Sequence, residues 1–426
     1  MGSHGGGDAL AIGLVGCGGM GRRHLNGYRL LREAGQRHFQ IAAVCDPNAP
    51  AADAAARFAE ELLGTRPASF RNAGDLIASG TVQALDIATD PRTHHVVAVP
   101  ALLEGLHVLC EKPLGLTVRA CRAIIDAAAQ SGAVLATAEN YRRDGPNRLA
   151  RAVLDSSMLG DIMLMIEINI GGDGGVLVSP WRHIREAGSI ALDMGVHYTD
   201  IFNYLLGPID RAAGKAFVAE PYRVLPDGAP RLPGIDEVSP GVMRATGDDS
   251  LVAVYETSAG AMIQLSYVPA GLGRAWTQRC VHGRDGSMSL PRDRTGGPVV
   301  VSLGQRTLSS DELRHELGGF QLEGIAGTLF GADGAEYNLP FATVDAAIIA
   351  IEIDDFLGAI AERRSPEVDG LGGLLAVAAV WAVTESHLQD GWVRIADVVD
   401  GEISRAQDPI DDAIGLRRSP ERKMPK

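Results

Sequence analysis

Residues 9–25, ALAIGLVGCGGMGRRHL, indicate the architecture of the first part of the chain. It opens with an apolar run bounded by glycine, which is typical of a buried parallel strand. A G-x-G-x-x-G pattern follows at Gly16, Gly18 and Gly21, and a helical pattern then covers about residues 20–33. In such a unit the glycines permit a tight turn, close approach of a pyrophosphate, and close packing of helix on strand. The sequence therefore predicts a dinucleotide site at a helix N-terminus.

The next apolar run, QIAAVCD, ends in Asp46, 25 residues after Gly21. An acid at this place accepts hydrogen bonds from the ribose hydroxyls of NAD and repels the 2′-phosphate of NADP. The alternative is that Asp46, followed by Pro47 and Asn48, only forms a turn. With the glycines in register, we favour NAD over NADP as the cofactor.

Strand and helix patterns alternate up to residue 138, which predicts a doubly wound parallel sheet of the Rossmann type. We expect helices at about residues 51–63, 93–104 and 117–130, and strands at 68–70, 84–89, 107–110 and 133–138. In such sheets, ligands bind beyond the carboxyl ends of the strands. The side chains at or just past these ends are Thr89, Asp90, His94, Glu111 and Lys112.

Lys112 belongs to HVLCEKPLG and is one of only four lysines among 39 Lys and Arg residues. Lysine can give up its proton when it is desolvated or lies near another cation, whereas arginine stays charged. A position that needs a removable proton therefore selects lysine. The alternative is an ordinary surface lysine after a strand.

After residue 139 the pattern changes to that of an α+β domain. Residues 161–170 read as a strand, 250–268 and 277–290 as hairpins, and 344–364 and 374–388 as helices. Residues 219–249 are rich in Pro, Gly and Asp, and we interpret them as an inserted loop, either a lid or an oligomer contact. We expect a Rossmann domain at 9–138, a substrate-binding and oligomerisation domain at 139–401, and a loose charged tail at 402–426.

SIALDMGVHYTDIFNYLLG, residues 189–207, places Asp193, His197 and Asp200 on one face of a helix. A histidine beside a carboxylate has a fixed tautomer and raised basicity, as a proton acceptor near neutral pH requires. The alternatives are a buried structural histidine, a surface ion pair, or a metal site. No further ligand cluster lies nearby, and we expect no metal.

The composition restricts the partners. The net charge of −14 is uneven, since residues 1–150 carry a balance of +1 and the remainder −15. An acidic second part argues against nucleic acid or an anionic membrane as a partner. No apolar run is long enough for a bilayer span, and residues 1–9 lack the apolar core of a signal peptide. Five scattered cysteines without metal-binding spacing indicate reduced thiols and a cytoplasmic protein.

From about residue 9 to residue 400, the chain resembles the glucose–fructose oxidoreductase / inositol dehydrogenase (Gfo/Idh/MocA) family. The resemblance rests on GCGGMG, VCD, IATDPRTHHVVAVPALLEGLHVLCEKPLG, ENYRRDGPNRLA, LGDIMLMIEI, LDMGVHYTDIFNYLLG and the late DGSMSL. EKP together with D-x-G-x-H-x-x-D, in this order, is its specific part. It implies an α/β protein: a Rossmann domain followed by an α+β domain with a large, mostly antiparallel open sheet.

The resemblance also implies the site. Its catalytic group would be Lys112, Asp193 and His197. The residues that would line the cofactor are Gly16, Cys17, Gly18, Gly19, Met20, Gly21, Asp46, Thr89, Asp90, His94, Glu111 and Lys112. The residues that would contact the substrate are Lys112, Tyr141, Arg142, Trp181, Arg182, Asp193 and His197.

Two local features depart from the family pattern. The threonine–proline step after the fourth strand is replaced by Thr89-Asp90-Pro91, and the approach to the catalytic helix, EAGSIALD, has fewer glycines. Trp181, Arg182 and His183 precede that approach, and Trp181 is either a stacking surface for a sugar or part of the core.

We expect an NAD-dependent dehydrogenase that oxidises a secondary alcohol of a sugar, sugar derivative or cyclitol to a ketone, reversibly. His197 would take the hydroxyl proton, assisted by Lys112 and Asp193. One alternative is glycoside cleavage by transient oxidation and elimination on tightly held NAD. Another is a non-catalytic NAD-sensing regulator, which the intact catalytic group argues against. We also expect a homodimer or homotetramer, formed through an exposed apolar face of the second sheet.

Overall fold

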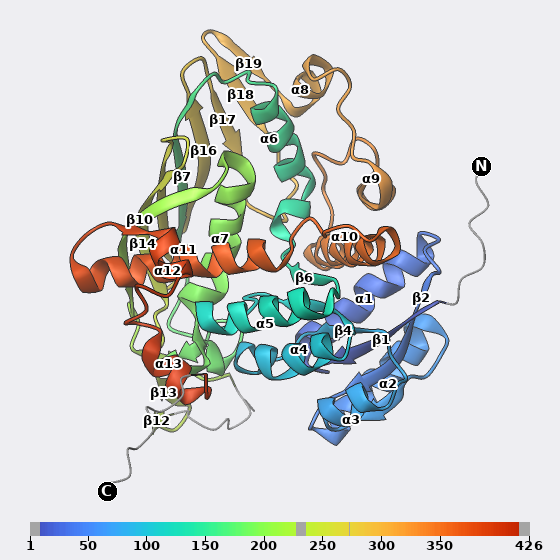
Figure 1. Cartoon of the computed structure of the whole chain (residues 1–426). Coiled ribbons are helices and arrows are strands. Elements are labelled where there is room, and N and C mark those ends of the chain that lie inside the picture. Colours follow the sequence, from blue (N-terminus) through green and yellow to red (C-terminus); the bar gives the residue numbers. More distant parts are fainter. Residues whose placement is uncertain (1–8, 227–235, 272, 417–426) are drawn as a thin grey trace, which may run out of the picture.

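The computed structural model describes residues 9–226, 236–271 and 273–416. Its first sheet is parallel, with strand order β3-β2-β1-β4-β5-β6 (Figure 1). The strands are β1 (Leu10–Val15), β2 (Phe39–Cys45), β3 (Ala68–Phe70), β4 (Ala84–Ile87), β5 (His107–Glu111) and β6 (Leu135–Ala138). The helices between them are α1 (Gly19–Glu33), α2 (Ala49–Leu63), α3 (Ala73–Ala78), α4 (His94–Leu103) and α5 (Val118–Ser131). The doubly wound parallel sheet is confirmed, and only the short α3 was not expected.

Local signals set the ends of these helices. The side chain of Asn48 accepts a hydrogen bond from the Ala51 amide, so α2 begins two residues earlier than expected. Thr117 caps α5 in the same way. Gly64 and Gly132 end the two helices in the left-handed conformation, which glycine adopts without steric cost.

The second sheet has the strand order β19-β18-β17-β16-β7-β15-β14-β10-β20. The strands are β7 (Ile162–Ile170), β10 (Ile209–Phe217), β14 (Ser250–Thr257), β15 (Met262–Val268), β16 (Trp276–Gly283), β17 (Ser287–Leu290), β18 (Val300–Leu303), β19 (Arg306–Leu308) and β20 (Val393–Arg394). The β7–β15 pair is parallel and the other pairs are antiparallel. Both expected hairpins, β14–β15 and β16–β17, are confirmed.

Helices cover one face of this sheet. They are α6 (Gly145–Asp155), α7 (Ile190–Leu206) and α11 (Gly370–Gln389) (Figure 1). On the other face Val252, Val254 and Trp276 are 42%, 37% and 54% exposed. The exposed Lys215 and Gln264 pair with Val252 and Val254 on the same face, so this face is open, but mixed rather than uniformly apolar as expected.

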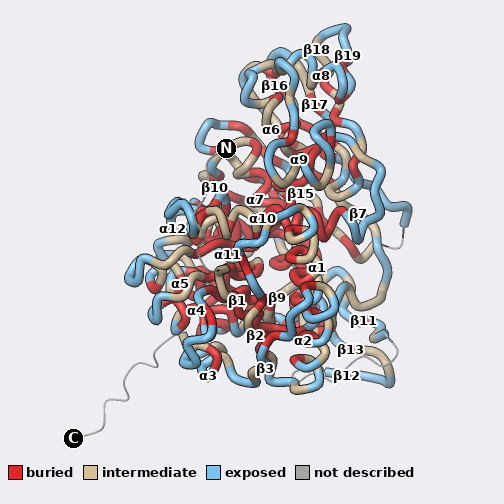
Figure 2. The backbone as a smooth tube through the Cα atoms, turned by 90° about the vertical axis from the view of Figure 1, so that its right-hand side faces the viewer, coloured by how far each residue is buried: buried red, intermediate tan, exposed pale blue. Residues whose placement is uncertain are grey.

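Helix α10 (Phe341–Glu362) links the two halves of the molecule. It packs on α1, where a Cβ added to Gly27 would lie 2.8 Å from Ile349. Ile349, Ile353 and Phe356 belong to the same core as the buried residues of α1, and the buried chain runs through the middle of the molecule around α7, α10 and α11 (Figure 2). A helix far along the sequence thus completes the core of the Rossmann sheet.

Helix α11 corrects one expectation from the sequence. It is long and apolar enough to cross a bilayer by length and composition, which we had not expected of any segment. However, 61% of that window is buried, and the helix packs against α7, β10 and α5. A core helix covered on several sides has the same composition as a membrane span.

The inserted segment at 219–249 is not simply a loop. Its described residues form a small sheet of β11 (Tyr222–Val224), β12 (Asp236–Ser239) and β13 (Val242–Arg244), and residues 227–235 lie outside the described part. The buried Arg223 side chain donates to the carbonyls of Asp173 and Gly175 and pairs with Asp249. This small sheet therefore supports the loop that leads to Trp181.

The C-terminal segment is packed as far as residue 416, so the expectation of a loose tail from 402 is wrong for that part. After α12 (Ile395–Val399), the short α13 (Asp408–Ala413) contacts the start of α5, where the Thr117 hydroxyl donates to Asp411. Gln407 accepts from the Val118 amide at 2.8 Å, and Ile410 is 1% exposed. The charged composition concealed the apolar side chains that anchor the segment, Ile410 with Ile403, Ala406 and Ile414 around it. The remaining helices, α8 (Ser310–Glu316) and α9 (Gly324–Phe330), lie in the segment between β19 and α10.

Ile410→Ala should destabilise the protein by about 2–5 kcal/mol, because it removes buried methyl groups and leaves a cavity. A lower urea midpoint would show this, with Val96→Ala as the control, since Val96 is 60% exposed. An unchanged midpoint in Ile410→Ala would mean that α13 does not stabilise the fold.

Candidate active site

The glycine turn between β1 and α1 has the geometry that a phosphate needs. Gly16 has φ +98°, and a Cβ on Gly21 would collide with the carbonyl oxygen of Gly16. Gly18 and Gly19 are exposed, with nothing within 4 Å of where a Cβ would stand. No side chain caps α1, and its first turn holds no acidic residue. The N–H groups at this helix end therefore suit the pyrophosphate of a dinucleotide.

Asp46 lies beside this turn. Its Oδ2 accepts from the Cys17 amide at 2.9 Å and its Oδ1 from the Asn48 amide at 2.8 Å. The Cys17 side chain is buried toward the Cys45 carbonyl, so Cys17 can offer only its backbone to a ligand, whereas Met20 is half-buried. Asp46 thus both forms the turn and stands where the nucleotide ribose is expected.

The residues that follow β4 and β5 form a tied pair of loops. His94 is buried, with Nδ1 2.9 Å from the Pro113 carbonyl and Nε2 3.2 Å from the Thr89 carbonyl. Asp90 pairs with Arg92 and begins a short helical turn. His94 therefore connects the loop after β4 to the loop after β5. Contact of His94, Thr89 or Asp90 with the cofactor stays a prediction.

A buried polar cluster stands behind Glu111. His24, on α1, has Nδ1 2.9 Å from Asp86 and Nε2 3.2 Å from Glu111. Burial opposes the charged imidazole, but the two carboxylates outweigh it and raise the pKa of His24 well above its ordinary value. Glu111 is thus held from inside the protein, and its contact with the cofactor also stays a prediction. His24 was not singled out from the sequence, although it stands three residues after Gly21.

Lys112 meets Asp193, as expected. Lys112 Nζ lies 3.0 Å from Asp193 Oδ1, and Arg182 Nε lies 2.8 Å from Oδ2 of the same carboxylate. Burial alone would raise the pKa of Asp193, but the two cations hold it well below its usual range. The Arg182 guanidinium also lies over the ring of Trp181, 4.1 Å from the centroid. Trp181 is half-buried, so it is neither pure core nor a free stacking surface.

The carboxylate partner of His197 is Glu139, which the sequence analysis missed. His197 Nδ1 lies 2.7 and 2.8 Å from the two Glu139 oxygens. The Tyr141 ring stacks on the imidazole with centroids 3.9 Å apart and planes 3° from parallel. Burial, and then the Lys112 cation, lower the pKa of His197 well below its ordinary value. Asp193 acts in the expected direction and raises that pKa, but burial and the Lys112 cation outweigh it, so the raised basicity expected for His197 is not found.

Three other expected or overlooked side chains surround this centre. Asp200 pairs with Arg142 at 2.9 Å and not with His197, so Arg142 is engaged in an ion pair in this structure. His183 is buried, its Nε2 accepts from the Leu177 amide, and burial lowers its pKa to about 4, which makes it structural. Arg294, from the loop after β17, donates to the Tyr141 hydroxyl at 2.9 Å. No local pattern marked Arg294.

The remaining question is whether a metal takes part. Among the residues that the structure describes, no group of three or more His, Cys, Asp or Glu side chains could hold a metal ion. The side chains that converge on the centre pair with one another as acids and bases.

Two family sequence models match this chain: "Oxidoreductase family, NAD-binding Rossmann fold" at residues 10–139 and "GFO/IDH/MocA C-terminal domain" at residues 147–289. The chain belongs to the GFO/IDH/MocA oxidoreductase family. Its Rossmann domain is the NAD-binding domain of that family, and the open glycine turn fits this cofactor.

Several GFO/IDH/MocA relatives resemble the chain over most of its length. Levoglucosan dehydrogenase of Pseudarthrobacter phenanthrenivorans is 26% identical over 91% of this chain and 99% of its own. Inositol 2-dehydrogenase 2 of Saccharopolyspora erythraea is 29% identical over 80% of this chain and 93% of its own. A solved levoglucosan dehydrogenase in complex with NADH and levoglucosan has a TM-score of 0.72 at 21% identity, covering 91% of this chain and 100% of that one. This last likeness shows the shared fold.

Asp46→Asn should raise the use of NADP relative to NAD, because the amide cannot repel the 2′-phosphate but still has an oxygen that accepts from Cys17. Asp46→Ala should weaken NAD by about 10- to 100-fold, the range for a lost hydrogen bond to a charged group. Comparing kcat/KM for both cofactors tests this. Equal use of NAD and NADP by the unaltered enzyme would contradict the assignment.

Proposed function

We propose that this protein is an NAD-dependent dehydrogenase that oxidises a secondary alcohol of a sugar, sugar derivative or cyclitol to a ketone, reversibly. The observation that carries the proposal is the meeting of Lys112 with Asp193, one helical turn before His197. Relatives named for levoglucosan and inositol support the substrate class.

His197 acts as the base in this proposal. Glu139 accepts the Nδ1 proton, so Nε2 carries the lone pair that removes the hydroxyl proton. The buried Lys112 cation orients the hydroxyl and stabilises negative charge on its oxygen. Bound NAD supplies the hydride acceptor.

Asp193 and Arg182 prepare Lys112 for this role. The carboxylate holds the ammonium at 3.0 Å, and Arg182 keeps that carboxylate ionised. Trp181 contributes a half-buried flat surface next to these charged groups, whereas the Tyr141 ring is buried between His197 and Arg294. A flat aromatic surface suits the C–H face of a sugar ring, so we assign the substrate to the space beside Trp181 and Lys112.

A panel of sugars and cyclitols, scored by NADH absorbance, tests the activity. Lys112→Ala, Asp193→Ala and His197→Ala should each lose kcat by about a hundredfold or more and bind NADH nearly normally. Lys112→Arg should not restore activity, because its side chain is only 8% exposed and a planar guanidinium does not fit where an ammonium does. Near wild-type turnover in both Lys112→Arg and His197→Ala would refute the catalytic assignment.

We also propose a cytoplasmic homodimer or homotetramer that associates through the open face of the second sheet. The five cysteines are free and buried, which supports a reducing compartment. Val252 and Val254 on β14 and Trp276 on β16 support association, because exposed apolar side chains gathered on a sheet face usually mark an interface.

Val254→Arg should convert the oligomer to a monomer, since a charge would be buried at the centre of the contact. Light scattering at micromolar concentration measures this, with Val96→Arg on α4 as the matched control. A monomeric wild-type protein would rule the interface out.

A further inference from the structure

Glu139 directly follows β6 and carries a carboxylate of unusual placement. Its side chain is only 3% exposed, and both oxygens face His197 Nδ1. The Tyr141 amide donates to Oε1 at 3.0 Å and fixes the carboxylate from the side. The carboxylate therefore has a single orientation, aimed at the imidazole.

Burial makes the ionised form of the Glu139 carboxylate unfavourable. Burial raises the pKa of Glu139 to about 7, while Lys112 and Arg142 act against that rise. A glutamine would make a similar contact with Nδ1 without a buried charge. A carboxylate at this position therefore differs from a glutamine in the negative charge that it places beside the imidazole.

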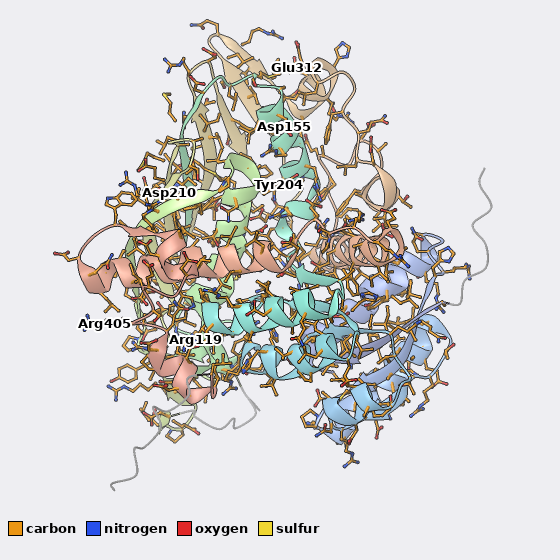
Figure 3. The ribbon with its side chains drawn as sticks, in the orientation of Figure 1. Arg119, Asp155, Tyr204, Asp210, Glu312 and Arg405 are labelled. Atoms are coloured by element: carbon orange, nitrogen blue, oxygen red, sulfur yellow. The ribbon has the colours of Figure 1, made fainter. Side chains whose placement is uncertain are left out.

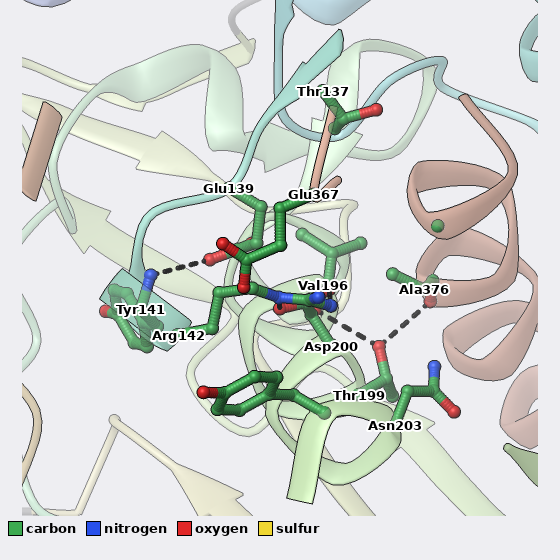
Figure 4. A network of polar contacts seen from close by, with 12 residues as sticks. Thr137, Glu139, Tyr141, Arg142, Val196, Thr199, Asp200, Asn203, Glu367 and Ala376 are labelled. Atoms are coloured by element: carbon green, nitrogen blue, oxygen red, sulfur yellow. Dashed lines mark hydrogen bonds and ion pairs between the residues drawn. The ribbon is translucent and has the colours of Figure 1, made fainter. Parts of the chain in front are cut away.

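Two other carboxylates near His197, those of Asp193 and Asp200, are paired with cations and not with the imidazole. Asp193 is shared by Lys112 and Arg182, and Asp200 is paired with Arg142, whose guanidinium lies 5.1 Å from the centroid of the Tyr204 ring on α7 (Figure 3). Figure 4 shows Glu139 above the Arg142–Asp200 pair, with the dashed bond from Tyr141. Of these three carboxylates, Glu139 is the one that contacts the imidazole.

We propose that Glu139 is the positioning residue of the acid–base unit, a role distinct from that of Asp193. This role rests on the proposed function, the oxidation of a substrate alcohol. The substrate O–H bond breaks, a new N–H bond forms at His197 Nε2, and the hydride on carbon goes to the nicotinamide. The imidazole gains one positive charge, which Glu139 neutralises, and the proton leaves to water when the ketone is released.

The charged and titratable groups that face His197 or Glu139 are Lys112, Glu111, Arg142, Asp193, Asp200, Arg294, Tyr141 and, from α10, the buried Glu352. Burial and Lys112 already lower the pKa of His197. Asp193 and Glu111 act to raise it, but Glu139 is the carboxylate bonded to Nδ1, so removing the Glu139 charge should lower the pKa of His197 further. A weaker base gives a lower kcat and moves the acid limb of the pH–rate profile to lower pH.

Glu139→Gln isolates the charge, because the amide oxygen can still accept from Nδ1. We expect kcat at pH 7 to fall by about 10- to 100-fold, as for loss of one acid–base contribution, with KM changed by less than about threefold. The acid limb should move to lower pH, and the dissociation constant for NADH should stay unchanged. Glu385 is also a buried carboxylate, and it lies on α11. Glu385→Gln is therefore the matched control and should leave kcat, KM, the acid limb and the dissociation constant for NADH unchanged.

Glu139→Asp keeps the charge, so its acid limb should stay near that of the wild type whatever its kcat. If the acid limb of Glu139→Asp moves to lower pH as far as that of Glu139→Gln, the charge does not have the proposed role. A Glu139→Gln enzyme with kcat within about twofold of wild type and an unmoved limb would overturn the proposal as well.

Nitrogen NMR of histidine-labelled enzyme supplies a readout that does not depend on turnover. The signal of His197 is assigned by its loss in His197→Gln. We expect the Nδ1–H tautomer in the wild type and in Glu139→Gln, and a mixture in Glu139→Leu. If no sugar or cyclitol is oxidised, the proposed function fails, but the tautomer still tests Glu139. The same tautomer in all three proteins would overturn its positioning role.

Discussion

The Asp193 carboxylate, held between Lys112 and Arg182, is the contact on which the site depends. Lys112 follows a strand of the first sheet, Asp193 lies on a helix of the second domain, and Arg182 comes from the loop before it. A buried carboxylate flanked by two cations stays ionised, and each cation is in turn held by it. Removing the carboxylate would leave the positive charges of Lys112 and Arg182 close together without a counter-charge. The placement of each of the three side chains therefore depends on the other two.

The packing that brings these groups together is contributed by distant segments. Helix α10 lies on α1, and Arg23 of α1 and Arg294 of the loop after β17 both pair with Asp345 at the start of α10. The same Arg294 reaches the Tyr141 hydroxyl beside His197. The glycine turn and the acid–base centre are therefore fixed to a common support, so that the cofactor-binding end and the chemical end keep their relative position.

Much of this could be predicted from local sequence, and the failures have a common cause. The glycine spacing, the rare Lys112 and the helical spacing of Asp193 and His197 each act within a few residues, so pattern reasoning found them. Glu139 lies 58 residues from His197, and no periodicity links the two. The small sheet of the insertion has short strands in a Pro- and Gly-rich segment. In each of these cases tertiary contacts, not local propensity, decide the structure.

The environment also divides the carboxylates of the site into different roles. Two cations hold the pKa of Asp193 low, whereas burial raises the pKa of Glu139 to about 7 and that of Asp200 to about 6. Carboxylates whose pKa values are pushed apart can take different roles in one site. Two contacts of the site, Lys112–Asp193 and Glu139–His197, join residues that follow strands β5 and β6 to residues of α7. The acid–base centre therefore exists only where the first sheet and α7 meet.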